Sequence, residues 1–123
     1  MTPDELARIA VDVVTQTQRK LPGEIRNLAA NVPVHYETFP SDDVIDDGFP
    51  EDILGLFTGS PHGHESDAAM PEMPQILLYL ENIWEFAESD LDAYREEVRL
   101  TYLHELGHYF GWDEDQLTAR GLD

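Results

Sequence analysis

The stretch TYLHELGHYF, residues 101–110, contains two histidines four residues apart, with a glutamate directly after the first. In an α-helix, positions i and i+4 differ by about 40° in azimuth, so His104 and His108 would face the same direction. Two imidazoles one turn apart can bind a single Zn2+ through nitrogen at about 2.0–2.1 Å. Glu105, about 100° further round than His104, is better placed to take a proton from water at the metal than to be a ligand. The pattern predicts a zinc site with Glu105 as general base.

The motif continues beyond His108. Gly111 lies three residues later, and Glu114 three after that. For this composition, HExxH alone should arise in roughly one shuffled sequence in 50, and the longer pattern in about one in a few thousand. Gly111 can adopt a left-handed conformation and turn the chain so that Glu114 faces the metal. We therefore expect Glu114 as the third protein ligand, with Asp113 and Asp115 as alternatives if the turn is wider.

The competing interpretation is a pair of core histidines that are hydrogen-bonded to backbone groups or carboxylates. The segment is the most apolar helical stretch of the chain, and burying three ionisable groups there without partners would be costly. The glycine and the acid at the extended positions favour the metal site over this interpretation.

Composition narrows the class of protein. The chain has 26 Asp and Glu against 7 Lys and Arg, a net charge of −19. Such a surface repels nucleic acid and anionic lipid. We expect any preferred peptide or protein partner to be basic. The absence of cysteine excludes disulfides, thiol catalysis and Cys-type zinc sites. The N-terminus lacks the basic region of a signal peptide, and no apolar run is long enough to span a membrane, so we expect a cytoplasmic protein.

Apolar periodicity predicts the elements that must position the motif. Helices are expected from the capping Thr2-Pro3 pair to about residue 20, over 24–31, from 82 onward, and from about 92 to Gly111, with a short last helix over 113–120. Strands are expected over 32–39, 53–57 and 75–80, and an acidic loop over 41–52.

The loop over 58–74 is rich in glycine, proline and histidine, and it is long for a compact domain. We expect residues 59–74 to be mobile and to lie near the mouth of the site. His62 and His64 are a candidate second metal site or lid ligand, with exposed loop histidines as the alternative. Gly107, inside the motif helix, would permit a strand to approach the site closely.

The segment from Pro74 to Leu122 resembles the small bacterial zincin-like proteins, also called minimal zincins or possible zinc metallopeptidases. It is marked by the strand ILLYLENI, the helix EEVRLTYLHELGHYFG and the tail DEDQLTARG. The resemblance implies a single α+β domain over residues 1–123, with a short mixed sheet packed on helices and the motif on the active-site helix. Two features depart from the family pattern: Glu114 stands where aspartate is more usual, and no methionine follows the motif.

The resemblance implies a zinc metallopeptidase with one Zn2+, held by His104, His108 and Glu114, and with Glu105 as the catalytic base. The substrate would be a peptide or protein, and an extended substrate would pair with the sheet beside Ile76–Leu80. The alternative is a metal-stabilised peptide-binding or regulatory module without turnover.

Overall fold

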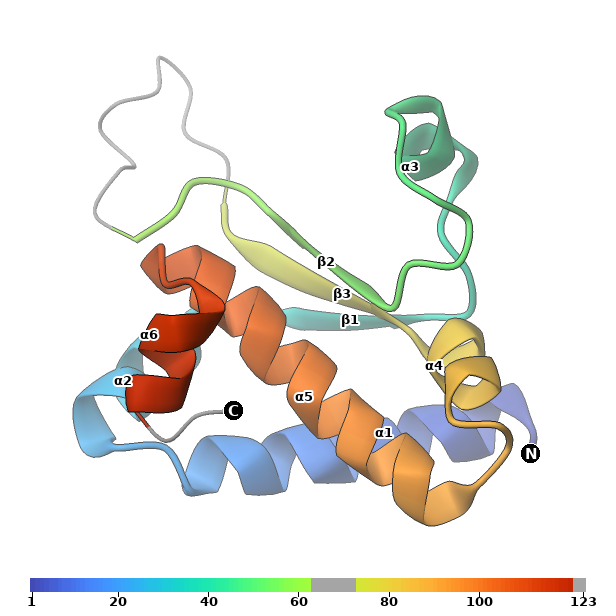
Figure 1. The fold of residues 1–123 in the computed structure, drawn as a ribbon, viewed down its shortest axis with the longest axis horizontal. Coiled ribbons are helices and arrows are strands. Elements are labelled where there is room, and N and C mark those ends of the chain that lie inside the picture. The colour runs from blue at the N-terminus through green and yellow to red at the C-terminus, as the bar shows by residue number, and fades with distance from the viewer. Residues whose placement is uncertain (63–72, 121–123) are drawn as a thin grey trace.

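The computed structural model describes residues 1–62 and 73–120. The elements follow in the order α1 (Pro3–Arg19), α2 (Gly23–Ala29), β1 (Val34–Glu37), α3 (Asp42–Asp46), β2 (Gly55–Thr58), β3 (Gln75–Tyr79), α4 (Leu80–Phe86), α5 (Leu91–Phe110) and α6 (Glu114–Ala119). Figure 1 shows α1 and α5 crossing on the same side of the short sheet. The expected α+β fold, with a small mixed sheet packed on helices, is confirmed.

The ends of the motif helix α5 are fixed by local sequence. Asp90 caps its start, because its carboxylate accepts a hydrogen bond from the Ala93 N–H at 2.8 Å. Gly111 ends it in a left-handed conformation, with φ of 72°. The N–H of Trp112 then bonds to the Gly107 carbonyl at 2.9 Å, and that of Gly111 to His108 at 3.1 Å, which together form a Schellman motif.

Several expected boundaries differ from the observed ones. The first two strands are shorter than expected, over Val34–Glu37 and Gly55–Thr58, and two other segments differ in the kind of element they form. The acidic segment 41–52 is not all loop, because Ser41 accepts a hydrogen bond from the Val44 N–H and starts the short helix α3. The third strand ends at Tyr79, and Leu80 already begins α4. The side chain of Asn82 donates to the carbonyls of Glu51 and Ile53, which ties α4 to the chain that leads into β2.

The sheet has the order β1-β3-β2, with β3 parallel to β1 and antiparallel to β2. The prediction that an extended substrate pairs with the sheet beside Ile76–Leu80 is therefore wrong. This segment is the central strand, and both of its sides are already paired. Among the described residues β2 pairs with β3 alone, so β2 is an edge strand on the side of α5.

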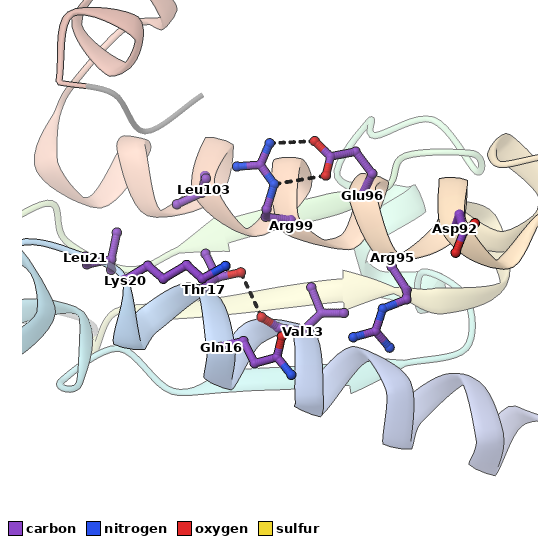
Figure 2. Close-up of a pocket in the computed structure, with 10 residues that line it drawn as sticks. All are labelled: Val13, Gln16, Thr17, Lys20, Leu21, Asp92, Arg95, Glu96, Arg99 and Leu103. Carbon is purple, nitrogen blue, oxygen red and sulfur yellow. Dashed lines mark hydrogen bonds and ion pairs between the residues drawn. The ribbon is translucent and has the colours of Figure 1, made fainter.

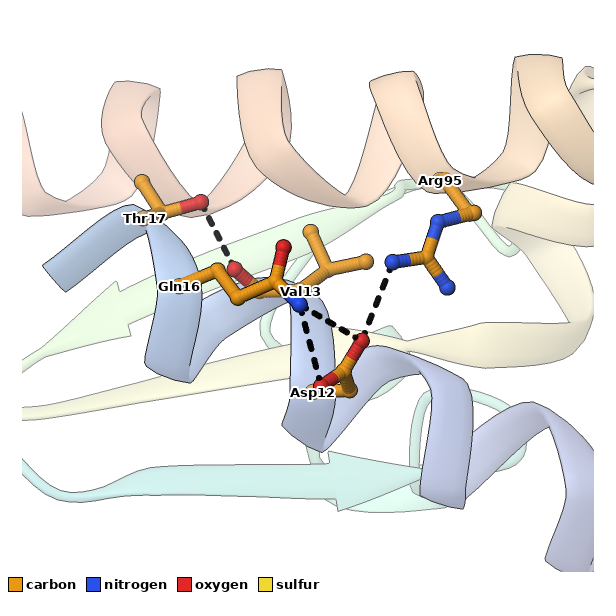
Figure 3. A network of polar contacts seen from close by, with 5 residues as sticks. All are labelled: Asp12, Val13, Gln16, Thr17 and Arg95. Atoms are coloured by element: carbon orange, nitrogen blue, oxygen red, sulfur yellow. Dashed lines mark hydrogen bonds and ion pairs between the residues drawn. The ribbon is translucent and has the colours of Figure 1, made fainter. Parts of the chain in front are cut away.

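Helix α5 is the central element of the core and contacts α1, α4, α6, β2 and β3. The Tyr94 hydroxyl, fully buried, donates to the Leu6 carbonyl of α1 at 2.8 Å. Nearer the surface, Arg95 of α5 pairs with Asp12 of α1 at 3.0 Å, and Asp12 also accepts from Gln16 (Figure 3). These contacts hold α5 on α1 and leave its opposite face to the sheet.

No helix in the described parts of the chain, 1–62 and 73–120, is both long enough and apolar enough to cross a membrane.

Candidate metal centre

The two motif histidines face solvent, whereas their neighbours on α5 are buried. Leu103, Leu106 and Tyr109 are in the core, but His104 and His108 are exposed. The two imidazole rings lie 4.9 Å apart between centroids, with an interplanar angle of 87°. The interpretation as two core histidines is therefore wrong: the chain keeps both rings at the surface, on one side of the helix.

His104, Glu105 and His108 each offer a ligand atom, and these atoms lie within 4.8 Å of one another. Ligand atoms around a tetrahedral zinc ion are about 3.3 Å apart, given bonds of about 2.0–2.1 Å. The two exposed imidazoles can close that difference by side-chain rotation, without moving the helix. The donor types and their spacing therefore fit a zinc ion.

Glu105 is in different surroundings from the histidines. It is only 8% exposed and lies between α5 and β2. Burial raises the pKa of its carboxyl group, while His108, His104 and a hydrogen bond from the backbone N–H of Phe57 act in the opposite direction. Its Oε1 is 3.9 Å from Nε2 of His108. A carboxylate with a raised pKa beside the two imidazoles has the properties of a general base.

The close approach of strand and helix at Glu105 requires Gly55. A Cβ atom at this position would lie 2.7 Å from Cγ2 of Thr101 and 3.3 Å from Cγ of Glu105. The expectation that Gly107 permits a strand to approach is wrong. The neighbour of Gly107 is Leu117 of α6, whose Cδ1 would be 3.0 Å from an added Cβ.

The three acids after Gly111 have separate surroundings. Asp113 caps α6 through a capping box: its Oδ1 accepts from the Gln116 N–H at 2.8 Å, and the Gln116 side chain accepts from the Asp113 N–H at 2.9 Å. Asp115 is exposed in the first turn of α6. Glu114 is the first residue of α6, but its side chain lies outside the described part of the structure, so its role as a ligand stays a prediction.

His62 lies at the C-terminal end of α5 and outside the metal-capable group. Its backbone N–H donates to the Tyr109 carbonyl at 2.7 Å, and its Nδ1 is 3.4 Å from the Tyr109 hydroxyl. These contacts fasten the chain after β2 to the end of the motif helix. His64, and most of the loop 59–74 that we expect to be mobile, lie outside the described residues.

A hollow of about 530 Å³ opens beside His104 and Glu105, and nothing in the sequence pattern signals it. Three segments line it: the chain around the start of β2, α5 and α6. The lining residues are Ile53, Leu54, Gly55, Leu100, Thr101, Leu103, His104, Glu105, Leu117 and Thr118.

A second hollow, of about 410 Å³, lies between α1 and α5 and holds no residue of the motif (Figure 2). Its rim carries Lys20, Arg95 and Arg99, a concentration of cations in so acidic a chain. Both arginines are engaged by acids, however: Arg95 by Asp12, and Arg99 by Glu96 through an Nε contact of 3.1 Å. The Arg95–Asp12 pair is part of the contact between α1 and α5, whereas the Arg99–Glu96 pair lies within α5.

Comparison with known proteins agrees with this geometry. A family model for zincin-like metallopeptidases matches residues 29–122, which span β1 to α6 and include the whole motif. No curated protein matches the chain. With most of its length covered by that model, and with the histidines and the glutamate of the motif gathered on one helix, the chain belongs to the zincin-like metallopeptidase family.

Proposed function

We propose that the protein is a zinc-dependent peptidase in which His104, His108 and Glu114 hold one metal ion and Glu105 is the catalytic base. The observation that carries the proposal is the group formed by His104, Glu105 and His108, whose ligand atoms lie within 4.8 Å on α5. When bound, a zinc ion polarises the scissile carbonyl and makes a water molecule acidic enough to attack it near neutral pH.

The task of Glu105 is proton transfer. Its carboxylate accepts a proton from the attacking water and passes it to the leaving amine when the peptide bond breaks. Its surroundings support this role, because burial raises the pKa of the carboxyl group toward the range in which it can both accept and release a proton. The Phe57 N–H holds the carboxylate against β2, with its Oε1 3.9 Å from Nε2 of His108.

The edge of β2 is a suitable place for an extended substrate. The Leu54 carbonyl accepts from the Tyr79 N–H at 2.9 Å, so Leu54 is paired toward β3. By the alternation of an antiparallel ladder, the backbone groups of Gly55 and Phe57 point to the other side. The Phe57 N–H is already bonded to the Glu105 carboxylate, so a substrate would pair with the Gly55 groups and the Phe57 carbonyl. A peptide that adds to this side would lie along the groove between β2 and α5, over Glu105.

The test is a comparison of wild type with Glu105→Gln, with Glu97→Gln as a control that removes the same charge elsewhere on α5. Metal analysis of each purified protein should find one zinc per chain. Cleavage of a peptide library should fall by about 10²–10⁴-fold or more in Glu105→Gln only, the range typical of lost general-base catalysis. Loss of zinc from Glu105→Gln would mean that this residue is a ligand.

The alternative function, a metal-stabilised binding module, predicts a different result from the same experiment. The wild type would then hold one zinc ion and cleave no peptide, and a closed shell of four protein ligands would leave no position for substrate. The exposed faces of His104 and His108 favour the peptidase over this alternative.

A further inference from the structure

We infer that the hollow beside His104 and Glu105 receives a large aliphatic or aromatic side chain of the substrate, on a residue that flanks the scissile bond. This inference rests on the proposed peptidase function and names the class of peptide that the site accepts.

The lining of the hollow is mainly aliphatic and comes from three separate segments. Ile53 and Leu54 precede β2, Leu100 and Leu103 belong to α5, and Leu117 belongs to α6. The volume of about 530 Å³ falls within the roughly 300–1,000 Å³ usual for ligand pockets. None of the described residues that line it is Lys or Arg, and Glu105 would repel an acidic side chain.

The hollow lies directly beside the candidate metal centre. His104 and Glu105 are themselves part of its wall. A side chain seated there keeps its own backbone next to the carboxylate that we propose as base. At the level of Gly55 the strand and the helix are in close contact, because an added Cβ would lie 2.7 Å from Cγ2 of Thr101, and both residues line the hollow.

Helix α6 supplies another part of the wall, through Leu117 and Thr118. Leu117 is 6% exposed and packs on Gly107, which has no side chain to keep it away. Thr118, the next residue, is exposed and lines the hollow, whereas Ala119 is exposed and does not line it. A bulky residue at position 118 therefore fills the hollow, and the same residue at 119 is its matched control.

The first experiment uses the metal-free protein and so does not depend on catalysis. Leucine methyl groups are followed by NMR while N-acetyl-L-phenylalaninamide or the α-amide of N-acetyl-L-aspartic acid, which keeps its β-carboxylate, is added. We expect the aromatic probe alone to shift the methyl signals of Leu54, Leu100, Leu103 and Leu117. Thr118→Trp should abolish these shifts, and Ala119→Trp should retain them. Equal shifts with the acidic probe, or no shifts with either, would overturn the inference whatever the metal does.

The second experiment links the hollow to the metal in zinc-loaded protein. Calorimetry compares acetohydroxamic acid, which can reach only the metal, with 3-phenylpropanohydroxamic acid, which adds an aromatic arm. Because burial of one large apolar side chain is worth about tenfold or more in affinity, the second compound should bind at least that much more tightly. Thr118→Trp should remove this gain without changing the affinity for acetohydroxamic acid.

The outcomes separate the two proposals. If neither compound binds the zinc-loaded protein, the metal centre proposed above fails, and the hollow has no scissile bond to flank. If both bind equally, the metal centre stands and the inference about the hollow is wrong.

Discussion

At the scale of single residues, the three consecutive acids after Gly111, residues 113–115, differ in their surroundings. The Asp113 carboxylate accepts the Gln116 N–H and starts α6, so it is already engaged in holding the backbone. Asp115 is exposed in the first turn of that helix. We propose Glu114 as the metal ligand, as the extended motif predicts, and the left-handed Gly111 supplies the turn that this proposal needs.

The third-ligand assignment predicts an order of zinc affinities. Glu114→Gln should raise the zinc dissociation constant most, by at least the 10- to 100-fold typical even of lost outer-sphere partners. Asp113→Asn should act more weakly, through the cap of α6, and Asp115→Asn should change little. Competition with a chromogenic chelator measures all three constants. A larger loss in either aspartate variant would move the ligand, and no loss in any variant would end the three-ligand hypothesis.

Glu105 should also make stability depend on pH in the metal-free protein. Burial raises the pKa of its carboxyl group above 4.5, its ordinary value, so the folded state binds a proton more readily than the unfolded state. The resulting stabilisation is complete below pH 4.5 and is lost as the pH rises through the folded-state pKa.

Glu105→Gln should therefore be more stable than wild type at pH 8, and its advantage should shrink as the pH falls toward 4. Urea denaturation of the metal-free proteins at several pH values measures this difference, with Glu97→Gln as the control for lost charge. An advantage of Glu105→Gln that stays constant from pH 4 to 8 would show that burial of the charge is not its cause.

At the scale of elements, the contact between β2 and α5 depends on the missing side chain of Gly55. Gly55→Ala would bring a Cβ to 2.7 Å from Cγ2 of Thr101 and 3.2 Å from the Leu77 carbonyl oxygen. A β-branched side chain in a helix is held in one or two rotamers, so Thr101 cannot easily turn away. We expect a loss of roughly 1–3 kcal/mol in the free energy of unfolding, the usual cost of overpacking.

Two comparisons make the Gly55 prediction specific. Gly23→Ala places a Cβ where nothing lies within 4 Å, and it should leave stability nearly unchanged. Thr101→Ser removes the methyl group in the closest contact, so the double variant should recover part of the loss, as a positive coupling in a double-mutant cycle. Full additivity of the two changes would show that this contact is not responsible.

The same elements show why some of the structure was predictable and some was not. The bounds of α5 were predicted within a residue or two, because Asp90 and Gly111 act on their own neighbours along the chain. The shared direction of His104 and His108 followed from their spacing, but their exposure did not, because the segment around them is apolar. The central position of β3 in the sheet was not predicted. It depends on the pairing of β3 with β1, for example Ile76 with Val34, and these strands are more than 35 residues apart in the sequence.

At the scale of the whole molecule, the hollow beside His104 and Glu105 could not be predicted from the sequence either. Its wall needs Leu54, Leu103 and Leu117 together, and these residues come from segments that only the complete fold brings side by side. The net charge of −19, in contrast, follows from the sequence alone, without knowledge of the fold. It acts over distances of about a Debye length, roughly 10 Å at 0.1 M salt, and so reaches any peptide near the surface.

The net charge predicts that basic peptides associate preferentially, and that salt removes the preference. Zinc-loaded Glu105→Gln, which should bind peptide without cleaving it, is the suitable protein for the measurement. Three peptides share one apolar core and carry lysine, serine or glutamate at both ends. At 20 mM NaCl the lysine peptide should associate faster than the serine peptide by on the order of tenfold, and the glutamate peptide more slowly. At 500 mM NaCl the three rates should converge, because exposed charges are screened beyond a few ångströms.

A lysine preference that survives high salt would instead require a direct ion pair at the site. Equal rates at both salt concentrations would show that the net charge of the molecule plays no part in the choice of peptide.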